Sequence, residues 1–351
     1  MSKLFYKALG KKEKWPNIEK AHPASLTYDD VLLIPQNSNI ESRSHVETRI
    51  KFGPYFLEKP IISAPMDTIS GEKMARELAK NGALGTIPRG DINKRLNICE
   101  SLSKDDVPAI YCVGLRNAYD ESKLLKEKGA KVILIDVAHG GMEAVKKMAK
   151  NIKNELELYV IAGNIVTFEE ANEYKKNNVD VARVGVGPGG TCITRLVAGT
   201  GFPQLSAVFE TTSAGIPVIA DGGIKKSADF AKAIAAGALA VMIGSLFAGT
   251  DETPGAIRNG KKIARGQASA AYMKDNGVET GEFRSAEGIS LEVPVKGPVS
   301  NVLDELMGGL RSAMTYSGAK NIEEFHKKAV FCLVSPSVDK ESKPWLSEIK
   351  K

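Results

Sequence analysis

The chain has 351 residues and a formal net charge of +6, with 43% hydrophobic and 26% charged residues. This length allows one to three domains, and the composition is ordinary for a globular protein. Because the lysines are spread along the chain, the charge argues against a nucleic-acid-binding face and favours small anionic ligands.

Cysteine content and apolar runs indicate the compartment. The four cysteines show no spacing typical of metal ligands, and residues 1–15 are basic without a long apolar core, so we expect reduced thiols and a cytoplasmic protein. Residues 233–250 carry no charge, but three glycines interrupt this stretch. We therefore predict a helix end, a strand and a turn there, and no membrane span.

Eight short apolar runs rich in β-forming residues follow one another along the chain. Charged, amphipathic segments fill most of the gaps; one of them opens with Thr167 and Glu170 at the spacing of a capping box. Strands that alternate with helices favour parallel pairing with right-handed crossovers. Eight such units predict an α/β protein with a (β/α)₈ TIM barrel, rather than an open doubly wound sheet. The runs are residues 60–66, 83–88, 109–114, 131–138, 157–164, 179–186, 217–224 and 238–245.

Unusual residues gather where these strands end. Catalytic groups of such barrels lie at the carboxyl ends of the strands, so we expect one functional rim. The segments concerned are residues 63–68, 136–140, 162–164, 187–195, 220–224 and 243–245.

The segment 187–195 places Cys192 in a glycine-rich loop, with Thr194 two residues further on. Glycines let a backbone approach a ligand closely, and a thiolate is a strong nucleophile. A tight turn around a buried structural cysteine would give the same local pattern. The position of the loop on the predicted rim favours the catalytic interpretation.

Two further turns on the rim suit a phosphate. Gly222 and Gly223 follow the seventh strand, and Gly244 and Ser245 follow the eighth. Backbone amides at these two places hold phosphates in many barrels. Asp221, beside the first turn, is suited to accept hydrogen bonds from sugar hydroxyls, although tight turns with a satisfied aspartate would look alike.

The regular spacing stops after the eighth strand. Residues 249–298 are rich in glycine and polar residues, and we expect them to form an active-site lid, followed by an amphipathic helix over 299–316. We expect a single barrel domain over residues 1–351.

Taken in order, the motifs resemble the family of IMP dehydrogenase and GMP reductase. The similarity covers roughly residues 26–318. It rests on the segments 26–35, 63–68, 187–195, 203–208, 221–223 and 308–312.

The resemblance implies that Cys192 attacks carbon 2 of a purine nucleoside monophosphate and forms a covalent thioimidate. Dehydrogenases of the family send a hydride to NAD and then add water, which converts IMP to XMP. Reductases expel ammonia from GMP and then take a hydride from NADPH, which gives IMP. Both branches share the cysteine loop, so other features must separate them.

Two features favour the reductase branch. About twenty residues separate the second and third predicted strands, which leaves no room for the regulatory domain pair that dehydrogenases usually insert there. The lid lacks the Arg-Tyr pair that activates water, and its run before Glu287 is similar to the reductase pattern. The resemblance then makes Glu287 and Thr194 a proton relay that turns the 2-amino group into a leaving group.

The resemblance therefore implies a GMP reductase-like oxidoreductase that uses NADPH. Three alternatives stay open: an IMP dehydrogenase without regulatory domains, a flavin-dependent barrel oxidoreductase, and a non-catalytic nucleotide-binding protein. A solvated lid carboxylate is the plain interpretation of Glu287.

The resemblance also assigns binding residues and an assembly. It places Asp136, Ala138, Asn164 and Arg89 near the cofactor, and implies a homotetramer. Carbonyls of Gly187, Gly189 and Cys192 would hold a monovalent cation, K⁺. Substrate contacts would come from Ser63, Met66, Gly189, Gly190, Asp221, Gly222, Gly223, Met242, Gly244, Ser245, Gly266, Gln267, Ala268, Ser269, Arg284, Ser285 and Gly288.

Three departures from the family pattern affect the substrate. Gly190 replaces a common serine, and residues 264–267 replace an aromatic-x-Gly-Met run and end in Gln267. Pro88 and Arg89 stand where the family usually has His-Lys. These changes leave GMP, dGMP and a modified guanine nucleotide open as substrates.

Overall fold

The computed structural model describes residues 25–277, 280–283 and 285–342. Its centre is a sheet of eight parallel strands in the order β4-β11-β10-β9-β8-β7-β6-β5. The two end strands meet where the Ser63 amide donates to the Leu84 carbonyl at 3.1 Å, so the sheet closes into a barrel. The strands are β4 (Ile61–Ser63), β5 (Gly85–Ile87), β6 (Ala109–Val113), β7 (Val132–Asp136), β8 (Tyr159–Ile165), β9 (Val181–Val184), β10 (Val218–Asp221) and β11 (Ala240–Ile243).

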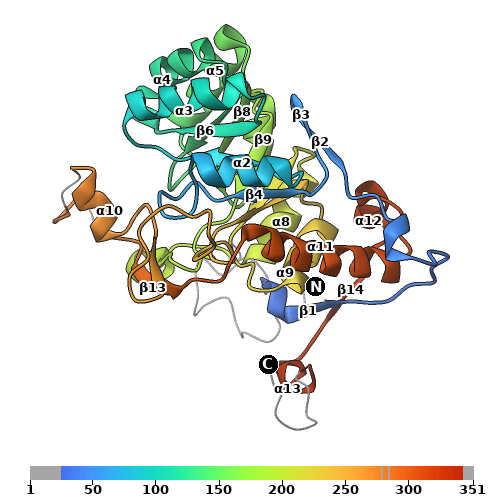
Figure 1. Cartoon of the computed structure of the whole chain (residues 1–351). Coiled ribbons are helices and arrows are strands. Elements are labelled where there is room, and N and C mark those ends of the chain that lie inside the picture. Colours follow the sequence, from blue (N-terminus) through green and yellow to red (C-terminus); the bar gives the residue numbers. More distant parts are fainter. Residues whose placement is uncertain (1–24, 278–279, 284, 343–351) are drawn as a thin grey trace, which may run out of the picture.

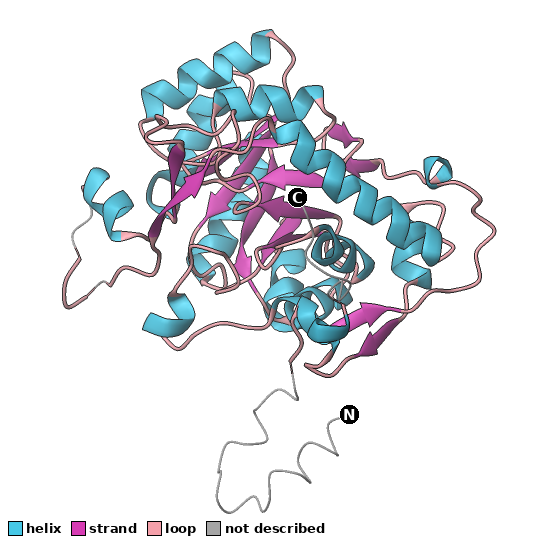
Figure 2. Cartoon of the chain, turned by 60° about the horizontal axis from the view of Figure 1, so that its bottom comes forward, coloured by secondary structure: helices cyan, strands magenta, loops and turns pink. Residues whose placement is uncertain are grey.

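Helices surround this barrel, as Figure 2 shows. One helix follows each barrel strand, and the capping box of Thr167 and Glu170 opens α6 as predicted. The prediction of a (β/α)₈ barrel is thus confirmed. The eight helices are α2 (Glu72–Lys80), α3 (Ile92–Lys104), α4 (Ala118–Glu127), α5 (Glu143–Leu156), α6 (Phe168–Lys176), α8 (Gln204–Ser213), α9 (Ser227–Ala235) and α11 (Val299–Tyr316).

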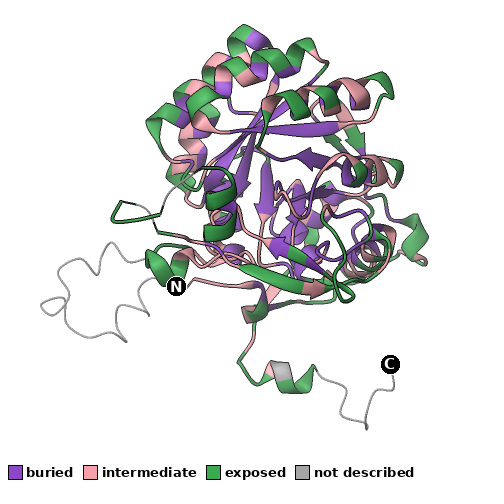
Figure 3. Cartoon of the chain, turned by 60° about the vertical axis from the view of Figure 1, so that its left-hand side comes forward, coloured by how far each residue is buried: buried purple, intermediate pink, exposed green. Residues whose placement is uncertain are grey.

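The barrel strands are buried (Figure 3), because one face of each strand lies toward the barrel interior and the other lies under the surrounding helices. This explains why their sequences are continuous apolar runs rather than alternating ones. Polar residues inside the strands are therefore exceptions. Asp136 ends the fully buried strand β7, and Arg183 stands in the middle of β9.

Smaller elements lie outside the eight-stranded sheet. The connection from β5 to β6 holds α3 alone, in line with the short spacing noted in the sequence. Among the described residues, none of the helices has both the length and the apolar character that a membrane span requires. The smaller elements are β1 (Val31–Leu33) paired with β14 (Phe331–Leu333), the hairpin of β2 (Ile50–Phe52) and β3 (Tyr55–Leu57), α7 (Thr194–Val197), α12 (Ile322–Lys328) and α13 (Val338–Glu341).

The segment after β11 is more regular than expected. It contains an antiparallel hairpin of β12 (Lys261–Arg265) and β13 (Ser290–Pro294), and the short helix α10 (Ala270–Asp275) lies between the two strands. Figure 1 shows α10 standing out from the barrel. The hairpin lies against the barrel, whereas α10 projects from it.

The strand β12 is held to the barrel by buried charge. The Lys262 side chain is on the buried face, and its Nζ donates to the carbonyl oxygens of Thr250 at 2.9 Å and Thr253 at 2.8 Å. Three residues later, Arg265 Nη2 donates to Asp67 Oδ2 at 2.5 Å. The hairpin therefore forms a fixed wall beside the rim.

We expect Lys262→Met to lower the free energy of unfolding by about 1–3 kcal/mol, because it removes the charged donor to the buried Thr253 carbonyl oxygen and one of the donors to the Thr250 carbonyl oxygen. Chemical denaturation measures this loss. Lys261→Met is the matched control, since Lys261 is exposed on the other face of β12 and should change stability by less than about 0.5 kcal/mol. Equal losses in the two variants would contradict the anchoring role of Lys262.

Candidate functional site

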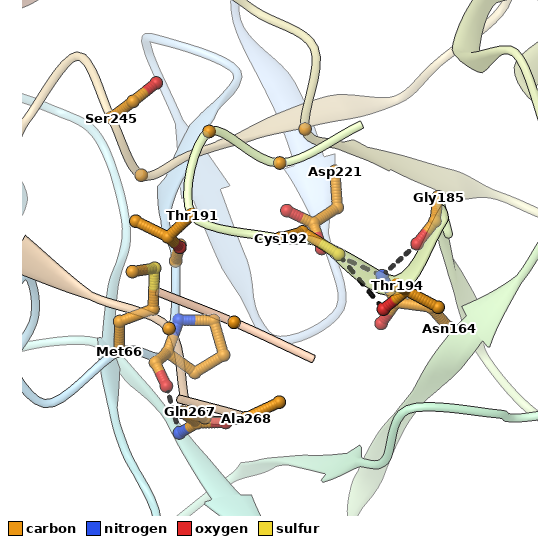
Figure 4. A pocket seen from close by; sticks show the side chains of 18 of the residues that line it. Met66, Asn164, Gly185, Thr191, Cys192, Thr194, Asp221, Ser245, Gln267 and Ala268 are labelled. Atoms are coloured by element: carbon orange, nitrogen blue, oxygen red, sulfur yellow. Dashed lines mark hydrogen bonds between the residues drawn. The ribbon is translucent and has the colours of Figure 1, made fainter. Parts of the chain in front are cut away.

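A cavity of about 590 Å³ lies at the carboxyl ends of the barrel strands. This volume is in the range of small-molecule sites. The rim segments predicted from the sequence meet there, together with β12 and the segment before β13 (Figure 4). Of the predicted site residues, the cavity is lined by Met66, Arg89, Asp136, Ala138, Asn164, Gly187, Gly189, Gly190, Cys192, Thr194, Asp221, Gly222, Gly223, Met242, Gly244, Ser245, Gly266, Gln267, Ala268, Ser285, Glu287 and Gly288.

Two predicted substrate contacts do not reach the wall. The Ser63 hydroxyl is buried and accepts a hydrogen bond from the Thr86 amide at 3.0 Å. Ser269 is also buried, and its hydroxyl caps α10 by accepting from the Tyr272 amide at 3.3 Å. Both hydroxyls are hydrogen-bonded within the fold, and the contact of these two residues with substrate stays a prediction. Arg284 lies outside the described residues.

The cysteine loop presents its thiol to the cavity. Cys192 Sγ donates to Thr194 Oγ1 over 3.2 Å, and the Cys192 amide donates to the Gly189 carbonyl at 3.1 Å (Figure 4). Gly185 follows β9 at the start of the loop and has a φ of +142°. A Cβ at this position would collide with the carbonyl oxygen of Asp221. The loop can therefore pass this close to β10 only with glycine at position 185.

The segment before β13 pairs with the cysteine loop. The Ile193 amide donates to the Glu287 carbonyl at 2.8 Å, and the Ile289 amide donates to the Thr191 carbonyl at 2.9 Å. These bonds place the half-buried Glu287 on the same cavity wall as Cys192. A thiol, a hydroxyl and a carboxyl group are thus assembled from two distant parts of the chain.

The two glycine turns offer free backbone donors. Gly222 has a φ of +92°, and within the described part of the chain the amides of Gly222, Gly244 and Ser245 form no hydrogen bond. Unpaired amides that line a cavity suit an anion such as a phosphate. A Cβ at Gly190 would lie 3.3 Å from the Ser245 Cβ, so glycine at position 190 leaves space beside this turn.

A row of alternating charges crosses the floor of the cavity. Arg89 Nε donates to Asp136 Oδ2 at 2.9 Å, and Arg183 Nη1 donates to Asp136 Oδ1 at 2.5 Å. Arg183 Nε then donates to Asp221 Oδ2 at 2.9 Å, and Asn164 Nδ2 donates to the same oxygen at 2.9 Å. Burial opposes the charge of Arg183, but Asp221 and Asp136 raise its pKa above the ordinary value.

Arg183 is a residue of the site that the sequence pattern did not predict. The signal was present, because an arginine inside the apolar run 179–186 is exceptional for a buried strand. Its partners could not be read from the sequence, since they end the strands β7 and β10, far away along the chain. Only the closed barrel shows that one guanidinium reaches both carboxylates.

Gln267 lines the cavity, but the oxygen and the nitrogen of its side-chain amide are both hydrogen-bonded within the protein. Its Oε1 accepts from Arg89 Nη2 at 3.1 Å, and its Nε2 donates to the Pro65 carbonyl. In this arrangement Gln267 holds Arg89 in place and joins β12 to the loop after β4.

Two of the other cysteines lie in a different environment. Cys112 is fully buried, and burial raises the pKa of its thiol well above the usual range. Burial also raises the pKa of Cys99. Both thiols are therefore inert, whereas Cys192 is half-buried at the cavity.

Comparison with known proteins places the chain in a family. Residues 25–345 match the family model described as the IMP dehydrogenase / GMP reductase domain. The chain is 40% identical to a protein of Ligilactobacillus salivarius named GMP reductase, over 86% of this chain and 94% of that protein. It is 38% identical to proteins of the same name from Streptococcus equi subsp. equi and Streptococcus gordonii, over 86% and 84% of this chain and 92% and 91% of those proteins. The chain belongs to the IMP dehydrogenase and GMP reductase family.

Proposed function

We propose that the protein is a GMP reductase that converts GMP to IMP and ammonia, with NADPH as the hydride donor. The observation that carries the proposal is the placement of Cys192, Thr194 and Glu287 on one wall of a cavity that also presents unpaired amides. Relatives that share 38–40% of their residues with this chain bear the name GMP reductase, which supports the same conclusion.

In the first step, Cys192 Sγ attacks carbon 2 of the guanine ring and forms a carbon–sulfur bond. Glu287 and Thr194 pass a proton to the 2-amino group, the carbon–nitrogen bond breaks, and ammonia leaves. The Thr194 hydroxyl is 3.2 Å from Sγ, which is near enough to serve such a relay. The product is a thioimidate that links Cys192 to the purine.

In the second step, the carbon–sulfur bond breaks and Cys192 recovers its thiolate as IMP is released. NADPH, when bound, supplies the hydride that carbon 2 receives. We place it at the end of the cavity formed by Arg89, Asp136, Ala138 and Asn164. This end fits a polar cofactor, because Arg89 lines the cavity and its side chain is 34% exposed.

We propose one barrel domain over 1–351, of which residues 1–24 and 343–351 lie outside the described residues, with residues 249–298 forming a lid beside the site. We also infer a cytoplasmic homotetramer; its four free thiols agree with a reducing compartment.

Of the three carbonyls predicted to hold K⁺, one is already engaged within the protein. The Gly189 carbonyl already accepts the Cys192 amide at 3.1 Å. Arg195 Nε lies 2.5 Å from the position that a Cβ on Gly187 would take, so the protein already places one cation beside this glycine.

The test is an assay of the purified protein with GMP and NADPH. We expect the nicotinamide absorbance to fall as IMP and ammonia form in equal amounts. A second assay contains IMP and NAD instead. Formation of NADH together with XMP in this assay would overturn the proposal in favour of a dehydrogenase. Flavin absorbance of the purified protein would favour a flavin-dependent enzyme instead.

The free oxygen of Asp221 predicts a preference for the ribonucleotide. Its Oδ2 is occupied by Arg183 and Asn164, whereas no described residue donates to Oδ1. A hydrogen bond from a ribose hydroxyl to this carboxylate is worth about 1.5–3 kcal/mol, so kcat/KM should be roughly tenfold or more higher for GMP than for dGMP. Asp221→Asn should reduce this difference. Equal kcat/KM values for the two nucleotides in the wild type would contradict this role.

A further inference from the structure

Arg183 is shared by two carboxylates from different ends of the cavity. Its Nη1 donates to Asp136 Oδ1 at 2.5 Å, and its Nε donates to Asp221 Oδ2 at 2.9 Å. Asp136 ends β7 at the proposed cofactor end, and Asp221 ends β10 beside the proposed phosphate turn. One guanidinium thus touches both ends of the site.

The side chains in this row of alternating charges have little freedom to rearrange. Arg183 is 8% exposed, so water screens its charge little, and the interaction with each carboxylate is strong. Its backbone also packs closely on β8, since the Arg183 carbonyl oxygen lies 2.5 Å from the position that a Cβ on Gly163 would take, a space that glycine leaves free. A change at one carboxylate must therefore alter the pairing of the guanidinium with the other.

The direction of this effect follows from the order of the charges. A sugar hydroxyl that donates to Asp221 Oδ1 withdraws negative charge from this carboxylate and weakens its hold on Arg183. Arg183 then pairs more strongly with Asp136, and Asp136 in turn holds Arg89 less strongly. The N–H groups of Arg89, now bound to Asp136 and Gln267, become better donors toward a ligand at the cofactor end.

We propose that Arg183 is a positioning residue that couples nucleotide binding at Asp221 to cofactor binding at Arg89, so that each ligand tightens the binding of the other. The inference rests on the proposed function, because that function assigns the ligands to the two ends. Coupling between binding sites is reciprocal, and factors of about 5 to 150 are typical.

The test measures NADP⁺ binding by calorimetry with and without saturating GMP, a pair of ligands that does not react. In the wild type, GMP should lower the Kd of NADP⁺ by about fivefold or more. Arg183→Lys keeps the positive charge, but an ammonium lacks the planar guanidinium fork that pairs with two carboxylates. The factor by which GMP lowers the Kd of NADP⁺ should therefore fall toward one. Asp136→Asn removes one of those carboxylates and should have the same effect, which provides a second variant if Arg183→Lys folds poorly.

Arg49→Met is the control, because Arg49 lies by the hairpin of β2 and β3 and contacts Phe56 at the surface; its coupling factor should equal that of the wild type. If the wild type binds each ligand alone but with a factor of one, the coupling role of Arg183 is wrong and the proposed function stands. A coupling factor equal to that of the wild type in a folded Arg183→Lys protein would also overturn the coupling role of Arg183. Failure of the wild type to bind GMP would refute the proposed function itself.

Discussion

Cys192→Ala is expected to reduce turnover of GMP by about four to six orders of magnitude, because no other described thiol lines the cavity to form the covalent bond. Nucleotide binding should persist, since the unpaired amides of the glycine turns and the Asp221 carboxylate remain. The measurements are NADPH oxidation with GMP and, separately, calorimetric binding of GMP.

Cys332→Ala is the matched control for this prediction. Cys332 lies on β14, which pairs with β1 outside the barrel, and its loss should leave turnover unchanged. Turnover close to the wild-type rate in Cys192→Ala would remove the thiol from the mechanism. A wild type that binds GMP but turns over nothing would favour the non-catalytic alternative.

Glu287→Gln is expected to slow conversion of GMP by about 10²- to 10⁴-fold, the usual contribution of a general acid or base. The glutamine keeps the shape of the side chain and removes its ability to exchange a proton. Since Glu287 is proposed to act only on ammonia release, hydride transfer from IMP to NADP⁺ on the enzyme should remain near the wild-type rate. Rapid mixing of enzyme, IMP and NADP⁺ measures that second step in reverse.

Measuring both half-reactions distinguishes a catalytic role of Glu287 from a structural role in the cavity wall. Glu292→Gln is the control, because Glu292 is exposed on β13 and pairs with Lys261. It should change neither half-reaction. If Glu287→Gln slowed both half-reactions equally, Glu287 would be a structural residue of the segment that pairs with the cysteine loop, and the relay would be wrong.

The barrel could be predicted because its strands are local patterns. Each strand is buried on both faces and is therefore a short apolar run, and each is followed by an amphipathic helix. The hairpin of β12 and β13 was not predicted. Its strands pair across more than twenty residues, and β12 carries Lys262 on its buried face, which the alternation of polar and apolar residues does not indicate.

The candidate site could be predicted in outline for a related reason. In a parallel barrel all strands end on one rim, so residues that follow the strands meet whatever their distance in the chain. Two hydroxyl groups are the exception: Ser63 and Ser269 stand in the right segments, but their hydroxyls accept hydrogen bonds from backbone amides. A hydroxyl has the same sequence signature whether it faces a ligand or an amide.

By itself, the sequence determined the (β/α)₈ barrel, the rim on which the site lies, and Cys192 as the candidate nucleophile, because local periodicity and loop composition carry that information. The tertiary structure alone decided which groups act together. It brought Glu287 to the wall of Cys192 through backbone pairing, and it placed Arg183 between Asp136 and Asp221. Those partners come from separate strands and loops, and the short range of hydrogen bonds and buried ion pairs lets them interact only once the barrel has closed.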